Sequence, residues 1–452
     1  MLAEEREALD EIVSRIRAGR ITRRTFLERA LALGLTGSSA VSLLEACGGS
    51  SNSSGGNGAS INLVWQSEQE STQTYQHLAD RFNQSIGQQQ GIHVTWLQGP
   101  ANSDDMLAKY NNMLRARDSS IDVLSIDIVY PAQFADSQWI KPLSERRWPA
   151  SERAKYLTAP LLGCTYQGKI WAAPLRTDVG LLYYRTDLVP RPPQSWDELT
   201  ASARNAMAKT RYGYVWQGAQ YEGLVCNFCE VLYGYGGAIL AANNPRQVTV
   251  NSSEGRAALT KMVSWVGSIS PAAVTSYLED SSRQVWQNGS AAYMRNWPYA
   301  YAMSKDAAQS QVDNRFAIHS IPYGGTNTVG HSAIGGWNLA INAFSQRQEQ
   351  AWQFIHYMLQ PPAQKTLALT AGLAVTLLST YDDPEVLQKG PLFALLKPVL
   401  QQALPRPVSP RYSNVSDAIQ RHVYQALKQQ SRPSDALRGL EDELKQINST
   451  IE

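Results

Sequence analysis

Aromatic side chains with polar atoms gather around a proline in the stretch YMRNWPYAY, residues 293–301. A buried core is built more simply from Leu, Ile or Phe, because Trp and Tyr carry polar atoms that need hydrogen-bond partners once they leave water. The whole chain shows the same preference, with 12 Trp and 21 Tyr against 8 Phe. The stretch therefore predicts one wall of a wet binding site, although core packing explains Trp297 or Tyr299 equally well when each is taken alone.

Acidic residues follow two predicted strands near the start of the folded part. Residues 61–66, 91–97 and 122–130 have the composition of strands, and the stretches between them repeat apolar residues at helical spacing. This βαβαβ order predicts an α/β fold with a doubly wound sheet, in which ligands collect outside the carboxyl ends of the strands. Glu68 or Glu70, after the first strand, and Asp127, at the end of the third, are expected to face a cleft.

Carboxylates, an arginine and aromatic rings in one cleft would bind carbohydrate. Carboxylate and guanidinium groups form charge-assisted hydrogen bonds to paired hydroxyls, and aromatic faces cover the C–H face of a sugar ring. A solvated surface group or a helix cap explains each acid equally well when it is taken alone.

Motifs for other chemistry fail. Residues 163–169 have the glycine and lysine spacing of a phosphate-binding loop, but Ile170 stands where a magnesium-binding Ser or Thr is required. The first strand-to-helix turn, WQSEQES, has no glycine for a dinucleotide, and GHSAI, residues 330–334, lacks the last glycine of a nucleophile elbow. The net charge is +2 with acids and bases interspersed, so no nucleic acid is expected as a partner.

The cysteines do not predict a disulfide framework or a zinc site. Cys164, Cys226 and Cys229 are an odd number beyond the N-terminal region, and the CxxC spacing of the last two has neither a second pair nor a histidine cluster beside it. Two small apolar residues on one helical face are the better interpretation. No metal and no cofactor are expected.

The first sixty residues indicate export. A twin-arginine pattern at Arg23 and Arg24 precedes a short, weakly apolar run, and residues 1–46 are interpreted as a signal peptide. The sequence LEAC, which ends at Cys47, resembles a bacterial lipobox, and a glycine- and serine-rich tether follows to residue 60. Cleavage would leave Cys47 acylated, with two acyl chains as a membrane anchor; a core cysteine beside a linker is the alternative.

A strand-rich piece returns after a long helical region, at residues 315–344, so the chain is expected to cross between two lobes more than once. The expected boundaries are 61–177 plus about 312–345 for lobe 1, and 178–311 plus 346–452 for lobe 2. A ligand cleft would lie between the lobes. Residues 195–198 fit a capping box at the start of a helix in lobe 2.

Several stretches resemble the trehalose/maltose-binding lipoproteins of ABC importers, within the extracellular solute-binding family 1. The similar stretches are DVLSIDIVYPAQFADSQWIKPL (122–143), DVGLLYYRTDL (178–188), GYVWQGAQYEGLVCNF (213–228), RNWPYAY (295–301), IGGWNLAI (334–341) and LPRPVSPRY (404–412). The resemblance implies a two-lobed, periplasmic-binding-protein-like fold. It also implies a sugar site made by Glu70, Asp127, Asp178, Glu222, Trp297, Tyr299, Gly336, Trp337 and Arg406, with Glu68 as the alternative to Glu70.

The same resemblance implies a function. The protein would capture an α-linked disaccharide or short oligosaccharide on the outer face of the cytoplasmic membrane, or in the periplasm. It would act as a monomer, close by hinge motion and dock on an ABC permease driven by cytoplasmic ATPases, without catalysing a reaction. A membrane-anchored glycoside hydrolase, which also uses paired carboxylates, and a sugar-sensing or adhesion lipoprotein are the alternatives.

Overall fold

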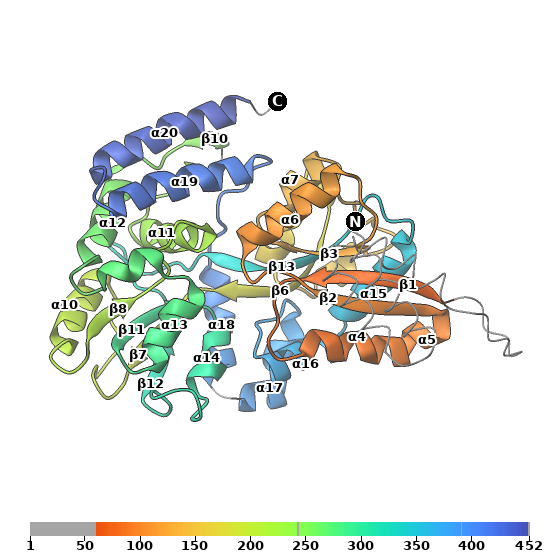
Figure 1. Ribbon diagram of the computed structural model, residues 1–452, viewed down its shortest axis with the longest axis horizontal. Helices are drawn as coiled ribbons and strands as arrows, with labels where there is room; N and C mark the ends of the chain where they lie inside the picture. The colour runs from red at the N-terminus through yellow and green to blue at the C-terminus, as the bar shows by residue number, and fades with distance from the viewer. Residues whose placement is uncertain (1–59, 242–243, 390, 451–452) are drawn as a thin grey trace, which may run out of the picture. The chain divides into compact units, whose positions relative to one another are not determined.

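The computed structural model describes residues 60–241, 244–389 and 391–450. The expected signal peptide and Cys47 lie outside these ranges, and so do all but the last residue of the tether. Residues Ile61–Glu452 form a unit of their own. Two main β-sheets divide this unit into the two lobes that the sequence predicts (Figure 1).

The sheet of lobe 1 combines parallel strands with one antiparallel strand. Its order is β2 (Ile92–Gln98), β1 (Ile61–Ser67), β3 (Val123–Asp127), β13 (Ile334–Ile341) and β6 (Ala173–Val179). β1 pairs in parallel with β2 and β3, as the predicted βαβαβ order requires, while β13 runs antiparallel to both β3 and β6. Every residue of β3 and β13 is buried, as expected for strands covered on both faces.

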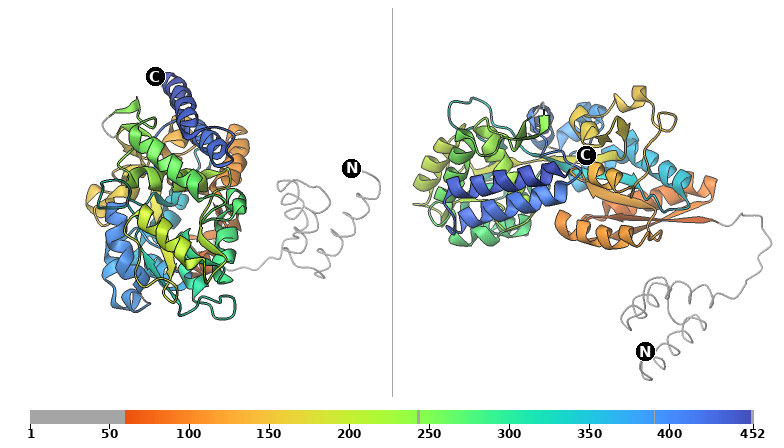
Figure 2. Two further views of the ribbon diagram at one scale, coloured as in Figure 1. Left: turned by 90° about the vertical axis from the view of Figure 1, so that its left-hand side faces the viewer. Right: turned by 90° about the horizontal axis from the view of Figure 1, so that it is seen from above.

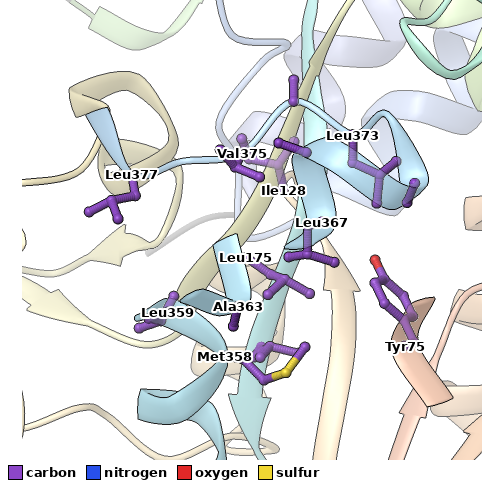
Figure 3. Close-up of a cluster of buried hydrophobic side chains, with 14 of the residues drawn as sticks. Tyr75, Ile128, Leu175, Met358, Leu359, Ala363, Leu367, Leu373, Val375 and Leu377 are labelled. Atoms are coloured by element: carbon purple, nitrogen blue, oxygen red, sulfur yellow. The ribbon is translucent and has the colours of Figure 1, made fainter. Parts of the chain in front are cut away.

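The helices of lobe 1 come from both halves of the chain. α15 and α16 pack against β6, β13 and α4, and buried side chains such as Met358, Leu359, Ala363 and Leu367 gather around Leu175 of β6 (Figure 3). The helices of this lobe are α4 (Thr74–Gln84), α5 (Ile86–Gln90), α6 (Ser103–Arg115), α7 (Pro131–Asp136), α8 (Ala150–Arg153), α9 (Thr158–Gly163), α15 (Gln348–Leu359), α16 (Pro361–Ala371), α17 (Pro384–Gln388) and α18 (Pro391–Gln402).

The sheet of lobe 2 has the order β12 (Phe316–His319), β7 (Leu181–Arg185), β11 (Ala291–Asn296) and β8 (Tyr212–Val215). The helices of this lobe are α10 (Trp196–Ala206), α11 (Glu222–Gly234), α12 (Ser253–Trp265), α13 (Glu279–Gln287), α14 (Tyr299–Ser304), α19 (Tyr412–Leu427) and α20 (Pro433–Ser449). α19 and α20 lie side by side along one side of the lobe (Figures 1 and 2). The Ser195 hydroxyl accepts from the Glu198 N–H at 3.1 Å, which confirms the N-terminal half of the predicted capping box.

Short two-stranded sheets and single turns complete the described part. β4 (Thr165–Tyr166) pairs with β5 (Lys169–Ile170), so the turn between them explains Gly168 of the failed phosphate-loop match, whereas Gly163 is the last residue of α9. β9 (Leu240–Ala241) pairs with β10 (Asn244–Val248). Two 3₁₀ turns span Ala272–Ser276 and Leu378–Asp382.

The chain crosses between the lobes three times, and the three crossings are hydrogen-bonded to one another. Gly180 separates β6 from β7, and Ser332 donates its hydroxyl to the Gly180 carbonyl at 2.7 Å. Leu404, on the crossing between α18 and α19, donates to the Ser332 carbonyl and accepts from the Ile334 N–H, both at 2.9 Å. These hydrogen bonds hold the three crossings against one another at the boundary between the lobes, where the hinge motion expected from the sequence would act.

Two of the expected lobe boundaries are wrong. Residues 316–319 pair with β7 in the lobe 2 sheet, so the strand-rich piece splits between the lobes instead of belonging to lobe 1. Helices α15–α18, assigned to lobe 2 within residues 346–452, instead cover lobe 1. Both errors have the same origin, because sequence periodicity identifies an element but not the sheet against which it packs.

Candidate functional site

A cavity of about 330 Å³ lies between the two lobes. It opens at the carboxyl ends of β1 and β3, where the doubly wound order predicts a ligand site. All nine residues that the resemblance implies line this one cavity: Glu70, Asp127, Asp178, Glu222, Trp297, Tyr299, Gly336, Trp337 and Arg406. Segments separated by up to several hundred residues of sequence therefore meet at one place.

Arg406 joins two of the predicted acids. Its Nη2 lies 2.9 Å from Asp127 Oδ1, and its Nη1 lies 2.5 Å from Glu222 Oε1. The Arg406 side chain is only 2% exposed, and its Nε has no hydrogen-bond partner within the described part of the chain. A buried donor without a partner is costly, so a ligand oxygen that reached this N–H would be stabilised by it.

Glu222 is the first residue of α11 and links the lobes through its backbone. Its carboxylate also accepts from the hydroxyls of Tyr412 and Ser416. Its own N–H donates to Oδ2 of Asp104, in the first turn of α6 in lobe 1, at 3.0 Å. Burial raises the pKa of Glu222, and Arg406 opposes this shift. Burial and then the charge of Glu222 raise the pKa of Asp104 to about 7.

Arg176 forms a second guanidinium–carboxylate cluster, which the sequence analysis missed. Its Nη2 lies 2.9 Å from Glu68 Oε1, and its Nη1 pairs with Asp178. Burial raises the pKa of Asp178 to about 6, against the opposing charge of Arg176. Arg176 lies two residues before Asp178 on β6, so the alternation of side chains along a strand was the signal that could have identified it.

The carboxylates of Glu68 and Glu70 differ in what they contact. Oε1 of Glu70 accepts from the N–H and the hydroxyl of Thr72, and Oε2 accepts from the Tyr75 N–H at 3.3 Å, so this group closes the turn before α4. Oε1 of Glu68 binds Arg176 and the Tyr75 hydroxyl, whereas its Oε2 is buried and finds no partner among the residues described. Both line the cavity, but Glu68 is the one with an acceptor to spare.

Trp297 and Tyr299 of the stretch at residues 293–301 line the cavity, whereas Tyr293 and Tyr301 of the same stretch are not among its lining residues. The indole Nε1 of Trp297 donates to Glu279 at 3.2 Å, and its ring lies over the Arg295 guanidinium, whose carbon is 3.8 Å from the ring centroid. The Tyr299 hydroxyl points to Asp280 at 3.4 Å. Trp337 pairs with Asp127 in the β13–β3 register, so a ring and a carboxylate lie beside each other.

The packing of β13 against β6 requires a glycine at position 336, whether or not a ligand approaches it. Its φ is +137°, and a Cβ there would lie 2.4 Å from the Arg176 carbonyl oxygen and 2.8 Å from the Thr177 Cα. The close approach of β6 therefore already requires glycine. Gly336 still lines the cavity, so a ligand can approach its backbone.

The first turn of α13 contributes residues that sequence reasoning did not identify. Glu279, Asp280 and Arg283 line the cavity beside the aromatic wall. Asp280 accepts from Arg283 Nη2 at 2.8 Å. In the sequence, these three residues have the pattern of an ordinary helix start, with acidic residues in the first turn and a basic residue at helical spacing from Asp280. The packing of α13 against β11 is what brings them to the site.

The cavity wall is acidic. It carries seven carboxylates against three guanidinium groups: Glu68, Glu70, Asp127, Asp178, Glu222, Glu279 and Asp280 against Arg176, Arg283 and Arg406. Carboxylates accept hydrogen bonds, so the wall suits a ligand rich in hydroxyl donors and disfavours an anion.

The cysteines behave as small apolar residues. Cys226 and Cys229 lie in α11, and both are buried and unpaired, as is Cys164. Burial raises the pKa of Cys226 well above its ordinary value and that of Cys229 to about 12. The interpretation of the CxxC spacing as an apolar pair is confirmed.

Across 60–241, 244–389 and 391–450, no group of three or more His, Cys, Asp or Glu side chains is placed to hold a metal ion. Over the same ranges, none of the helices has the length and apolar character that crossing a membrane requires.

Comparison with known proteins gives a consistent relationship. The family model for bacterial extracellular solute-binding proteins matches residues 77–394. A probable ABC transporter-binding protein of Deinococcus radiodurans is 36% identical over 371 residues, which cover 79% of this chain and 87% of that protein. The chain is thus similar to a substrate-binding component of an ABC transporter over most of both lengths.

Solved structures agree with the fold. Maltose-bound MalE3 of T. maritima superposes with a TM-score of 0.80 at 33% identity, over 86% of this chain and all of that one. The GacH receptor of Streptomyces glaucescens, solved unliganded and with acarbose, superposes with a TM-score of 0.77 at 22% identity over 87% of this chain, and that likeness concerns the fold alone. On the family match and the Deinococcus relative together, the chain belongs to the bacterial extracellular solute-binding proteins.

Proposed function

We propose that this substrate-binding component captures an α-linked disaccharide or short oligosaccharide of the trehalose/maltose type and delivers it to an ABC permease. The observation that carries the proposal is the cavity wall, where two arginine–carboxylate clusters line the same space as Trp297, Tyr299 and Trp337. Sugars present hydroxyls at their edges and C–H groups on their faces, and these two kinds of side chain complement them. The maltose in the similar T. maritima structure supports this choice of ligand.

The size of the cavity favours a short ligand. Its volume of about 330 Å³ is near the lower end of the range for small-molecule pockets, about 300–1,000 Å³. A disaccharide suits this space better than a long dextrin. The buried Arg406 Nε and Glu68 Oε2 supply one donor and one acceptor that a sugar hydroxyl could satisfy.

Binding without turnover is the expected behaviour. A glycoside hydrolase needs one carboxyl to donate a proton and a second carboxylate to act as base or nucleophile. Here Asp127 and Glu222 are both held by Arg406, and Glu68 and Asp178 by Arg176. Incubation with trehalose, maltose and longer α-glucans, followed by chromatography, should return every sugar intact; release of glucose would favour the hydrolase alternative.

Calorimetric titration tests the ligand directly. The purified chain from residue 60 onward would be titrated with trehalose, maltose, sucrose and maltotriose, with a sugar phosphate as the matched anionic control. Tight binding of a neutral disaccharide and no binding of the phosphate is the expected result. Absence of binding to the whole panel would contradict the proposed ligand class. A separate assay of permease-coupled uptake would distinguish an importer component from a sensor or an adhesin.

Membrane anchoring is the remaining part of the proposal. Cys47 would be acylated after cleavage of a twin-arginine signal peptide, which leaves a monomeric binding domain on the outer face of the cytoplasmic membrane or in the periplasm. Metabolic labelling with a fatty acid should mark the wild-type protein and leave the Cys47→Ala variant unlabelled. Light scattering of the soluble part should give the mass of one chain, and a dimer mass would contradict the monomer.

A further inference from the structure

A fully buried ion pair lies behind the aromatic wall. Arg295 Nε is 2.8 Å from Glu230 Oε2 and Arg295 Nη2 is 2.5 Å from Glu230 Oε1, with the two side chains 0% and 1% exposed. Arg295 Nη1 also donates to Gln217 Oε1 at 3.1 Å. A buried pair of this kind is weak evidence for stability, because removing two charges from water costs about as much as their attraction returns. Its contacts on either side indicate another role.

On one side the pair touches two of the three chain crossings. Glu230 Oε1 accepts from the Ala333 N–H at 3.2 Å, just before β13. At Gly180, between β6 and β7, an added Cβ would lie 2.0 Å from Glu230 Oε1 and 2.6 Å from Arg295 Nη2. The Gly180 backbone therefore lies directly against the paired groups, and any larger residue there would displace them.

On the other side the pair touches the ligand cavity. The guanidinium carbon of Arg295 is 3.8 Å from the centroid of the Trp297 ring, a stacking distance. The far edge of the same ring reaches Gly335, where an added Cβ would be 3.4 Å away. Trp297 lines the cavity, whereas Arg295 and Glu230 are not among the residues that do.

We propose that Arg295, fixed by Glu230, is a positioning residue that ties the orientation of the Trp297 ring to the geometry of the Gly180 and Ala333 crossings. A change in hinge angle moves these crossings against Glu230, the bidentate pair passes the displacement to the guanidinium, and the ring turns with it. The inference rests on the proposed function of Trp297 in sugar binding. A lysine would keep the charge but lose the planar group that both stacks and binds bidentately.

The affinity arm of the test compares two matched substitutions. Arg295→Lys is set beside Arg185→Lys, since Arg185 is also buried and bidentate, to Asp187, on the neighbouring strand β7. Neither arginine lines the cavity, and the Trp297 ring stacks on Arg295. Arg295→Lys should weaken maltose binding about 10-fold, which is within the range of couplings between contacting side chains, and Arg185→Lys should not. In a Trp297→Ala background, Arg295→Lys should cause no further loss. Equal losses in both backgrounds would overturn the proposal.

A second arm needs no ligand. With 5-fluorotryptophan incorporated, the ¹⁹F resonance of Trp297 is identified by its loss in Trp297→Phe. It should shift in Arg295→Lys and in Glu230→Gln, and keep its position in Arg185→Lys. An unmoved resonance would overturn the proposal. Glu230→Gln keeps the shape of the side chain, so its resonance tests the positioning of Trp297 even if Arg295→Lys does not fold. If the wild type binds no sugar, the proposed function fails, but this ligand-free measurement still tests the positioning.

Discussion

The carboxylate of Asp104, in the first turn of α6, accepts a hydrogen bond of 3.0 Å from the backbone N–H of Glu222, the first residue of α11 in the other lobe. A carboxylate at a helix N-terminus is well placed for the exposed N–H groups there. This one belongs to the opposite lobe. This hydrogen bond can therefore form only when the two lobes are together.

Ligand affinity is expected to depend on pH through Asp104. Burial raises its pKa to about 7 with the lobes together, and Glu222, Asp417 and Asp127 are the acids that add to the shift. An exposed Asp104 would titrate near its ordinary value, so closure takes up a proton between about pH 4 and pH 7. Affinity should therefore rise as the pH falls from about 7.5 to about 5.5, by at most about tenfold per pH unit for one proton.

The control for this pH dependence is Asp104→Asn. It keeps an oxygen that can accept from the Glu222 N–H but has no charge to titrate. The variant should lose most of the dependence, and the rest would reflect Asp178, whose pKa burial raises to about 6. The free energy of unfolding should depend on pH in the same direction. The stability that the raised pKa of Asp104 contributes is fully present below the ordinary carboxyl pKa and is lost as the pH rises through 7. A flat wild-type profile, measured by calorimetry, would contradict this linkage.

Arg406→Ala should destabilise the fold as well as weaken binding. It would leave Asp127 and Glu222 buried without their common partner, and breaking a buried ion pair costs about 3–5 kcal/mol. Urea unfolding of the ligand-free protein measures the loss. Arg411→Ala is the matched control on the same crossing, because Arg411 is 43% exposed and its pair with Asp136 should contribute less than about 1 kcal/mol. Equal stability losses in the two variants would refute the distinction.

Glu68 and Glu70 should respond differently to amide substitution. Glu68→Gln removes a buried charge that binds Arg176 and has an oxygen left for a ligand, so we expect affinity to fall by about 10- to 100-fold, as for a charged hydrogen bond. Glu70→Gln should mainly loosen the turn before α4, with affinity close to that of the wild type. Titrating both variants with the same disaccharide tests this, and a larger loss in Glu70→Gln would reverse the assignment.

The buried thiols should be inert in the folded protein. Burial raises the pKa of Cys229 to about 12, and the thiolate is the reactive form. A soluble disulfide reagent at about pH 8 should therefore label none of Cys164, Cys226 and Cys229 until denaturant is added. Rapid labelling of Cys164 or Cys229 in the native protein would show that its surroundings open locally. Labelling of Cys226 alone would show that the reagent enters the ligand cavity, which Cys226 lines.

Local patterns predicted the βαβαβ start of the chain well, because short apolar runs mark its strands and apolar residues at helical spacing mark its helices. The apolar spacing of Tyr75, Leu78, Ala79 and Phe82 corresponds to the buried face of α4. The stretch at residues 293–301 was different. Its aromatic and polar content predicted one wall of a binding site, and the structure places its first four residues, 293–296, in the buried strand β11, which ends where the wall begins. This one short stretch contributes both to the buried core and to the cavity wall, and the periodicity of the sequence alone does not show which residues do which.

The candidate site divides in the same way. Trp337 and Arg406 could be placed in the site through the resemblance of their stretches to a known family, and Asp127 also through its position at the end of a predicted strand. Arg176 and Glu279 reach the cavity through long-range packing, of β6 beside β13 and of α13 on β11. The partners of Arg406 could not be predicted either, because they lie 279 and 184 residues away along the chain.

The position of β13 in the lobe 1 sheet has a consequence during synthesis. This strand, Ile334–Ile341, lies between β3 and β6, both of which are complete by Val179. A ribosome that adds about 5–20 residues per second needs roughly 10–30 s to pass from one point to the other. Throughout that interval β3 and β6 present unpaired edges, which are the surfaces on which nascent chains aggregate. The order of strands thus leaves the sheet of lobe 1 unfinished until β13, the fourth strand in its spatial order, emerges.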